Sequence, residues 1–153
     1  MPSSSKTPEK KSSPKKRADI KYEDKSTGQP ELVLIFEEIK KLLLPYAKGA
    51  IKLYGGDNGK IILMSEKDIE AAGRKMKEIW FASALVQKGY VGFYYMPIYT
   101  HSNKVKKLLS PELLKCLKGK ACFHIKKQDA IILSQIKDAL KIGYDCYKEM
   151  DWV

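Results

Sequence analysis

Residues that build metal centres and disulfide frameworks are scarce in this chain, which has three cysteines and two histidines among 153 residues. An odd number of cysteines cannot all pair, and a chain of this length buries enough apolar surface to fold without disulfides. We therefore expect reduced thiols that pack as small apolar side chains. These are Cys116, Cys122 and Cys146.

Long apolar runs are absent as well. No stretch approaches the ~20 consecutive apolar residues that cross a bilayer, and the N-terminus is rich in Lys and Ser where a signal peptide would be apolar. The sequence therefore predicts a cytoplasmic protein without a membrane partner. Its length predicts one globular domain.

The common patterns of metal, nucleotide and catalytic sites are missing too. Neither Cys-x-x-Cys nor His-x-x-x-His occurs, and the glycines of residues 55–59 lack the Gly-Lys-Ser/Thr order of a phosphate-binding loop. Cys122 and His124 lie two apart on a predicted strand, but no third group can be named that would orient the histidine as a base. From the residues themselves we expect neither enzyme chemistry nor a cofactor.

Positive charge, in contrast, is abundant, and the formal net charge is +11. Residues 1–27 hold eight Lys or Arg against four Asp or Glu, with a single Ile and a single Tyr. Because so few apolar residues cannot offset the entropy of ordering, we predict a disordered basic tail over 1–27 and a domain over 28–153. The tail is interpreted as a nucleic-acid tether, a nuclear import signal or a solubilising segment, and these alternatives stay open.

Apolar periodicity and turn residues predict an α+β domain. Helical spacing predicts an amphipathic helix that is opened by Pro30 and stopped by Pro45, and a long helix that begins after Asp129 and ends near Glu149. A glycine-rich turn joins two β-prone runs, 51–54 and 60–64, into a hairpin. The remaining elements are a connection of undetermined shape over 65–74, a short helix over 111–118, and a strand over 120–126.

A second hairpin is predicted around Lys88-Gly89, because a two-residue X-Gly loop between apolar runs is typical of this motif. With that loop Gln87 faces Tyr90, and the register then places small residues opposite large rings. The further pairs are Val86 with Val91, Leu85 with Gly92, Ala84 with Phe93, Ser83 with Tyr94, Ala82 with Tyr95, Phe81 with Met96, and Trp80 with Pro97.

The two sides of this hairpin differ in composition. One side carries Val, Ala, Phe and Trp, and we expect it to lie against the helices. The other side mixes rings with hydroxyl and amide groups, which suits a flat ligand, a stacked base or an oligomer interface. A second covering layer that includes Trp152 is the alternative. The mixed side is predicted to consist of Phe81, Ser83, Gln87, Tyr90, Tyr94 and Met96.

A candidate ligand site follows from the mixed side. Phe81, Tyr90 and Tyr94 are its expected stacking groups, and Lys120 and His124 are its expected polar contacts if their strand is adjacent. Such a site predicts a non-enzymatic protein that binds a small ligand or a partner protein.

Three segments resemble one branch of the YdhG-like family, a group of small, mostly bacterial proteins whose function is largely unassigned. They are QKGYVGFYYMP (87–97), LLKCLKGKACFHIKK (113–127) and GYDCYKEMDWV (143–153). The resemblance covers the chain from about Pro30 to Val153. It implies an α+β fold in which an antiparallel sheet is flanked by N- and C-terminal helices, similar in outline to frataxin.

The resemblance also implies an alternative function, since one bacterial member is regarded as a frataxin-like iron chaperone for iron–sulfur and haem assembly. Frataxins hold iron weakly through carboxylates on the first helix and the adjoining strand edge, as suits a hard cation. The corresponding helix here offers Glu31, Glu37 and Glu38, with Lys40 and Lys41 beside them. Iron is the one cofactor that the resemblance raises.

Overall fold

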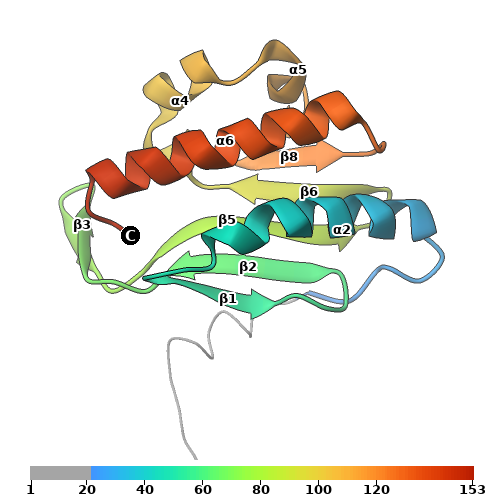
Figure 1. The fold of residues 1–153 in the computed structure, drawn as a ribbon, viewed down its shortest axis with the longest axis horizontal. Helices are drawn as coiled ribbons and strands as arrows, with labels where there is room; N and C mark the ends of the chain where they lie inside the picture. Colours follow the sequence, from blue (N-terminus) through green and yellow to red (C-terminus); the bar gives the residue numbers. More distant parts are fainter. Residues whose placement is uncertain (1–21) are drawn as a thin grey trace, which may run out of the picture.

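Six antiparallel strands form the main sheet, in the order β1-β2-β5-β6-β8-β7 (Figure 1). The computed structural model describes residues 22–153. Within them, β3 (Ile69–Ala71) and β4 (Arg74–Met76) form a separate two-stranded sheet. The strands of the main sheet are β1 (Ile51–Gly55), β2 (Lys60–Ser65), β5 (Ile79–Gln87), β6 (Tyr90–Tyr95), β7 (Leu117–Lys118) and β8 (Cys122–Ile125).

Two long helices, α2 (Pro30–Leu43) and α6 (Ala130–Glu149), contact each other and lie across the same face of the sheet (Figure 1). A proline opens α2, and Asp129 caps α6 by accepting hydrogen bonds from two backbone amides. The prediction of an α+β fold with flanking N- and C-terminal helices is thus confirmed. The shorter helices are η2 (Leu44–Tyr46), α3 (Pro97–Thr100), α4 (Ser102–Leu108) and α5 (Pro111–Leu114).

The core lies between the sheet and these helices. Burying each large apolar side chain there contributes about 1.5–3 kcal/mol, so this layer supplies most of the stabilisation. Its largest fully buried side chains are Phe36, Phe81, Phe93, Tyr95, Phe123 and Tyr147. No helix within residues 22–153 is long and apolar enough to cross a membrane.

The β5–β6 hairpin turns at Lys88-Gly89 with the predicted register. Gly89 has a φ of +88°, a conformation that glycine adopts without strain. The predicted pairs hold from Gln87 with Tyr90 to Ala82 with Tyr95. Met96 is no longer in β6, and Pro97 begins α3.

A β-bulge corrects the prediction at the start of β5. In the pairing with β2, Leu63 lies opposite Ala82 but Met64 lies opposite Trp80, so Phe81 is an extra residue. An inserted residue exchanges the two faces of the sheet for the residues that precede it in the strand. Phe81 therefore lies in the core and Trp80 lies on the opposite side of the sheet, where the sequence prediction had them exchanged.

The segment before α2 is held against the far end of the β5–β6 hairpin. Tyr22 donates a hydrogen bond of 2.9 Å from its hydroxyl to the carbonyl oxygen of Val86. Gln29 donates to the carbonyl oxygen of Gln87 at 3.0 Å and accepts from the amide of Gly89 at 2.9 Å. Residues 22–27 of the expected tail thus lie beside the hairpin, and the rest of the tail, up to position 21, lies outside the described residues.

Two local expectations also differ from the structure. The connection over 65–74 contains β3 and the start of β4, joined by Ala72 and Gly73, which both have positive φ values. This is the backbone of a tight two-residue hairpin turn. The helix expected over 111–118 ends at Leu114, because its last residues form β7 beside β8.

Candidate ligand-binding face

The side of the sheet opposite α2 and α6 carries most of the predicted mixed surface. Strand pairing brings side chains from β5, β6 and β8 to this side, since alternate residues point the same way. Ser83, Leu85 and Gly92 are buried, and the other side chains on this side are partly exposed. We call this the mixed face, and it consists of Trp80, Ser83, Leu85, Gln87, Tyr90, Gly92, Tyr94, Cys122 and His124.

Tyr94 lies at the centre of the mixed face and is held on several sides. Its ring lies over Gly92, where an added Cβ would be 2.9 Å from Cε1 of the ring. Trp80 stacks beside it with ring centroids 6.3 Å apart. Burial raises the pKa of Tyr94 to about 12, and the neighbouring Cys122 thiol adds to this shift. Tyr94 is therefore a fixed, neutral part of the surface.

Tyr90 and His124 form a close stack at one end of the mixed face. Their ring centroids are 3.7 Å apart and their planes differ by 13°. They come from neighbouring strands, since His124 lies opposite Gly92 and Tyr90 is two residues before it. Burial lowers the pKa of His124, and Lys126 and Lys118 lower it further. At neutral pH the imidazole is therefore an uncharged ring.

A cavity of about 370 Å³ adjoins His124 at the β7–β8 edge of the sheet. Four exposed lysines line it, and none of them forms an ion pair within residues 22–153. The one acidic residue in its lining is Asp129, whose carboxylate already accepts hydrogen bonds from the amides of the first turn of α6. We call this site the lysine cavity. Its lining is Lys115, Cys116, Lys118, His124, Ile125, Lys126, Lys127, Asp129 and Ile132.

The structure brings together only part of the predicted ligand site. Tyr90, Tyr94 and His124 share the mixed face, as expected. Phe81 does not, because the bulge turns it into the core, where it packs against Tyr147 at a centroid distance of 5.4 Å. Lys120 lies over the ring of Tyr99, 5.7 Å from its centroid, and does not line the lysine cavity.

The sequence prediction missed the residues that give the site its charge. Lys126 follows His124 at a spacing of two, which places both on one side of an extended chain. That spacing is a signal that could have been used. Lys115 and Lys118 reach the cavity through the contact of β7 with β8, which no short-range pattern reveals.

Trp152 does not cover the mixed face. It lies in the core cluster, where its ring meets that of Tyr147 edge-on at 5.1 Å. Its carbonyl oxygen accepts a hydrogen bond from the buried hydroxyl of Ser65, and its indole donates to the carbonyl oxygen of Glu70. The alternative of a second layer that includes Trp152 is therefore wrong for this residue.

The candidate iron ligands lie on α2 among lysines. Glu37 forms an ion pair with Lys40 at 3.4 Å, and Glu38 forms one with Lys41 at 3.1 Å. Glu31 is exposed in the first turn of the helix. Nowhere in the described part of the chain do three or more His, Cys, Asp or Glu side chains form a group that could hold a metal ion.

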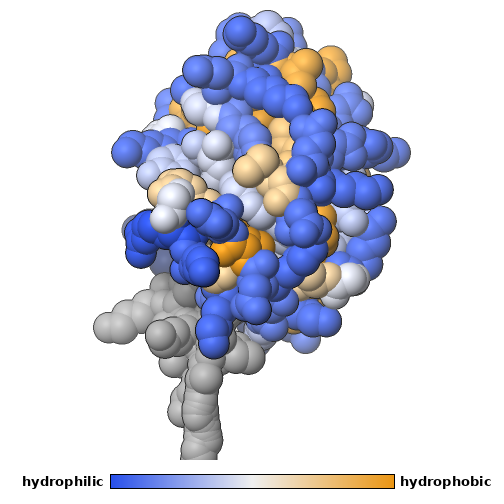
Figure 2. All heavy atoms as spheres, turned by 90° about the vertical axis from the view of Figure 1, so that its left-hand side faces the viewer, coloured by the Kyte–Doolittle hydropathy of each residue, from blue (hydrophilic) through white to orange (hydrophobic). Residues whose placement is uncertain are grey.

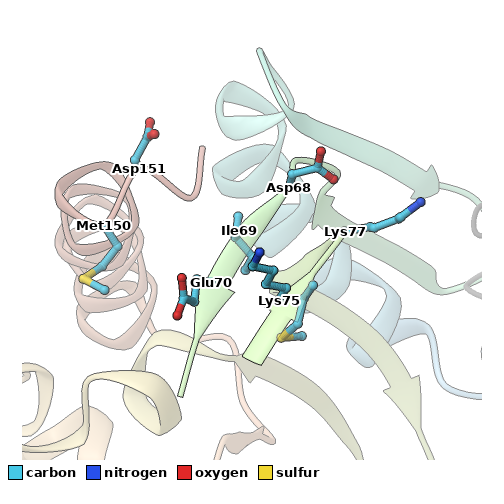
Figure 3. A pocket seen from close by; sticks show the side chains of 8 residues that line it. Asp68, Ile69, Glu70, Lys75, Lys77, Met150 and Asp151 are labelled. Atoms are coloured by element: carbon cyan, nitrogen blue, oxygen red, sulfur yellow. The ribbon is translucent and has the colours of Figure 1, made fainter. Parts of the chain in front are cut away.

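Two further hollows lie around the β3–β4 hairpin, at the end of the molecule shown in Figure 2, where apolar residues lie between hydrophilic ones. One, of about 650 Å³, lies between this hairpin and the end of α6, and side chains of both charges line it beside Met150 (Figure 3). The other, of about 460 Å³, is mainly apolar and includes Met64, Trp80, Met96 and Tyr99. Neither gathers charge of one sign.

Comparison with protein-family models, curated proteins and solved structures finds no match to this chain. What the protein binds therefore has to be inferred from the chemistry of its own side chains. The Tyr90–His124 stack and the lysine cavity are the two features that combine a defined geometry with a defined chemistry.

Proposed function

We propose that this protein is a non-enzymatic binding protein that holds a small planar ligand on the mixed face, against Tyr90 and His124. The observation that carries the proposal is the parallel arrangement of these two rings, 3.7 Å apart and partly exposed. A flat ligand that lies on the exposed side of the pair extends the stack. Offset aromatic stacking contributes about 0.5–1.5 kcal/mol beyond the area buried.

The rigid backbone that carries the Tyr90–His124 stack favours this function. Both rings rise from paired strands of the main sheet, and Tyr94 fills the space over Gly92 beside them. A surface that is already ordered loses little conformational entropy when a ligand binds. Preorganisation of this kind is what distinguishes a binding site from a loose surface cluster.

The state of the thiols supports binding over catalysis. Burial raises the pKa of Cys122, which lies on the same strand as His124, and burial likewise raises the pKa of Cys116. A nucleophilic cysteine requires the opposite shift, because the thiolate is the reactive form. Both thiols are therefore protonated at neutral pH.

An NMR titration with adenosine, an uncharged planar probe, tests the proposal. We expect shifts confined to β6 and β8, and a loss of affinity of about tenfold when Tyr90 or His124 is replaced by leucine. Tyr99→Leu is the matched control, since Tyr99 is an exposed tyrosine outside the stack. Shifts elsewhere on the protein, or equal loss in the control, would contradict the proposed site.

We also infer membership of the YdhG-like family from the three segments that resemble it. An antiparallel sheet with N- and C-terminal helices agrees with what that resemblance implies. Iron delivery through Glu31, Glu37 and Glu38 has no comparable support, because lysines neutralise two of these carboxylates. Nucleic-acid binding through the basic tail remains a prediction, since most of the tail lies outside the described residues.

A further inference from the structure

The lysine cavity is an unbalanced concentration of positive charge. Four lysines line it, and Asp129 is the single acidic residue of the lining. Some lysines elsewhere on the surface are balanced by carboxylates, as Lys104 is by Glu149 at 2.8 Å and Lys141 by Asp145 at 2.7 Å. Like charges that converge without partners repel one another, and an anion placed among them relieves the repulsion.

Three separate parts of the chain supply the lysines. Lys115 follows α5, Lys118 lies in β7, and Lys126 and Lys127 follow β8. The first turn of α6 also borders the cavity through Asp129 and Ile132. The positive end of this 20-residue helix adds to the field that an anion would experience there.

His124 connects the cavity to the stack. Its ring lies against Tyr90, and the same residue lines the lysine cavity. A ligand whose ring lies on the stack therefore has its substituents next to the lysines. A cavity of about 370 Å³ is in the size range of small-ligand sites and has room for a phosphate.

We propose that the ligand of the mixed face is a nucleoside phosphate, with its base on the Tyr90–His124 stack and its phosphate in the lysine cavity. This inference rests on the proposed function, because it assumes a planar ligand on the stack. It adds the chemical class of that ligand and assigns Lys118 and Lys126 as the phosphate contacts. The same chemistry is found in a free nucleotide and at the end of a nucleic-acid strand.

Calorimetry with adenosine, AMP, inorganic phosphate and a short oligoadenylate tests the assignment. At low salt AMP should bind about tenfold or more tightly than adenosine, since charge-assisted hydrogen bonds add to the stacking. The double variant Lys118→Gln/Lys126→Gln should reduce AMP affinity to that of adenosine and leave adenosine binding unchanged. Lys106→Gln/Lys107→Gln removes the same charge from exposed positions of α4 and should change neither.

The outcomes separate the two proposals. If adenosine binds but AMP binds no more tightly, the phosphate assignment is wrong and the planar-ligand function stands. If inorganic phosphate binds in a way that needs Lys118 and Lys126 but adenosine does not bind, the cavity assignment is supported and the stacking site is overturned. If oligoadenylate binds more tightly than AMP and the double variant loses this binding, the phosphate comes from a nucleic-acid strand. If oligoadenylate binds the double variant as tightly as it binds the wild type, the inference is wrong.

Discussion

The hydroxyl of Tyr147 on α6 donates a hydrogen bond of 2.6 Å to the backbone carbonyl oxygen of Trp80 on β5. Trp80 borders the β-bulge that turns Phe81 into the core and leaves Trp80 on the mixed face. Burial raises the pKa of Tyr147 well above its usual value, so the hydroxyl stays protonated and keeps donating. The last turns of α6 are thereby tied to the irregular point of the sheet.

Replacing Tyr147 with phenylalanine should therefore destabilise the protein by about 1–2 kcal/mol, because the packing of the ring is kept but the partly buried hydrogen bond to the Trp80 carbonyl is lost. The free energy of unfolding in urea measures this change. Tyr99→Phe is the control and should have little effect, since Tyr99 is 55% exposed. If both variants unfold at the same urea concentration, the bond to Trp80 contributes nothing.

Two fully buried serines should respond in opposite directions to replacement by alanine. The hydroxyl of Ser83 has no hydrogen-bond partner within residues 22–153, whereas that of Ser65 donates to Trp152. Ser83→Ala should raise the free energy of unfolding by up to about 1–2 kcal/mol, and Ser65→Ala should lower it by a similar amount. Thermal melts of the two variants provide the comparison. A destabilised Ser83→Ala variant would reveal a partner for that hydroxyl.

Gly143 on α6 is a position where the helix lies too close to Tyr95 of β6 and Pro97 of α3 to accept a side chain. A Cβ there would lie 2.6 Å from Cγ of Pro97 and 2.7 Å from the hydroxyl oxygen of Tyr95. Gly143→Ala should cost about 1–3 kcal/mol through overpacking, although alanine favours a helix. Ser134→Ala, at an exposed position of the same helix, should be neutral or stabilising. Chemical denaturation of both variants tests the difference, and a more stable Gly143→Ala protein would exclude the close contact.

Acidification between pH 7.5 and 5.5 should weaken the fold through its two histidines. Burial lowers the pKa of His101 and of His124 below 6.5, with Lys104 adding to the first shift and Lys126 to the second. The unfolded chain therefore binds protons first as the pH falls, so stability that is present above pH 6.5 is lost below it. The free energy of unfolding, measured across this range, should fall less in His101→Gln/His124→Gln. An identical pH profile for this variant and the wild type would contradict the pKa shifts.

The register of the β5–β6 hairpin could be predicted because one local signal determines it. Lys88-Gly89 permits a two-residue turn, and every pair from Gln87–Tyr90 onward then follows. The N-terminus of α6 was predictable for a similar reason, since Asp129 satisfies amides only two and three residues away. Both features depend on chemistry within a few residues.

The features that the sequence did not reveal depend on residues far apart in the chain. The bulge at Phe81 arises where β5 pairs with β2, about 20 residues earlier in the sequence, and nothing in β5 alone marks an extra residue. The lysine cavity likewise requires Lys115 to meet Lys126, which only the β7–β8 pairing achieves. The rings of the candidate site could therefore be named from the sequence, whereas the lysines that β7 brings to it could not.

Under the proposed function, the placement of α2 and α6 on one side of the sheet leaves folding and ligand binding to different sets of side chains. Tyr90, Lys118 and His124 lie outside the core cluster, so selection can exchange them without repacking the interior. A scaffold of this kind can acquire a new ligand specificity through a few substitutions. Among proteins that share this architecture, we expect divergence to be greatest at these positions and least along the helix-facing side of β5 and β6.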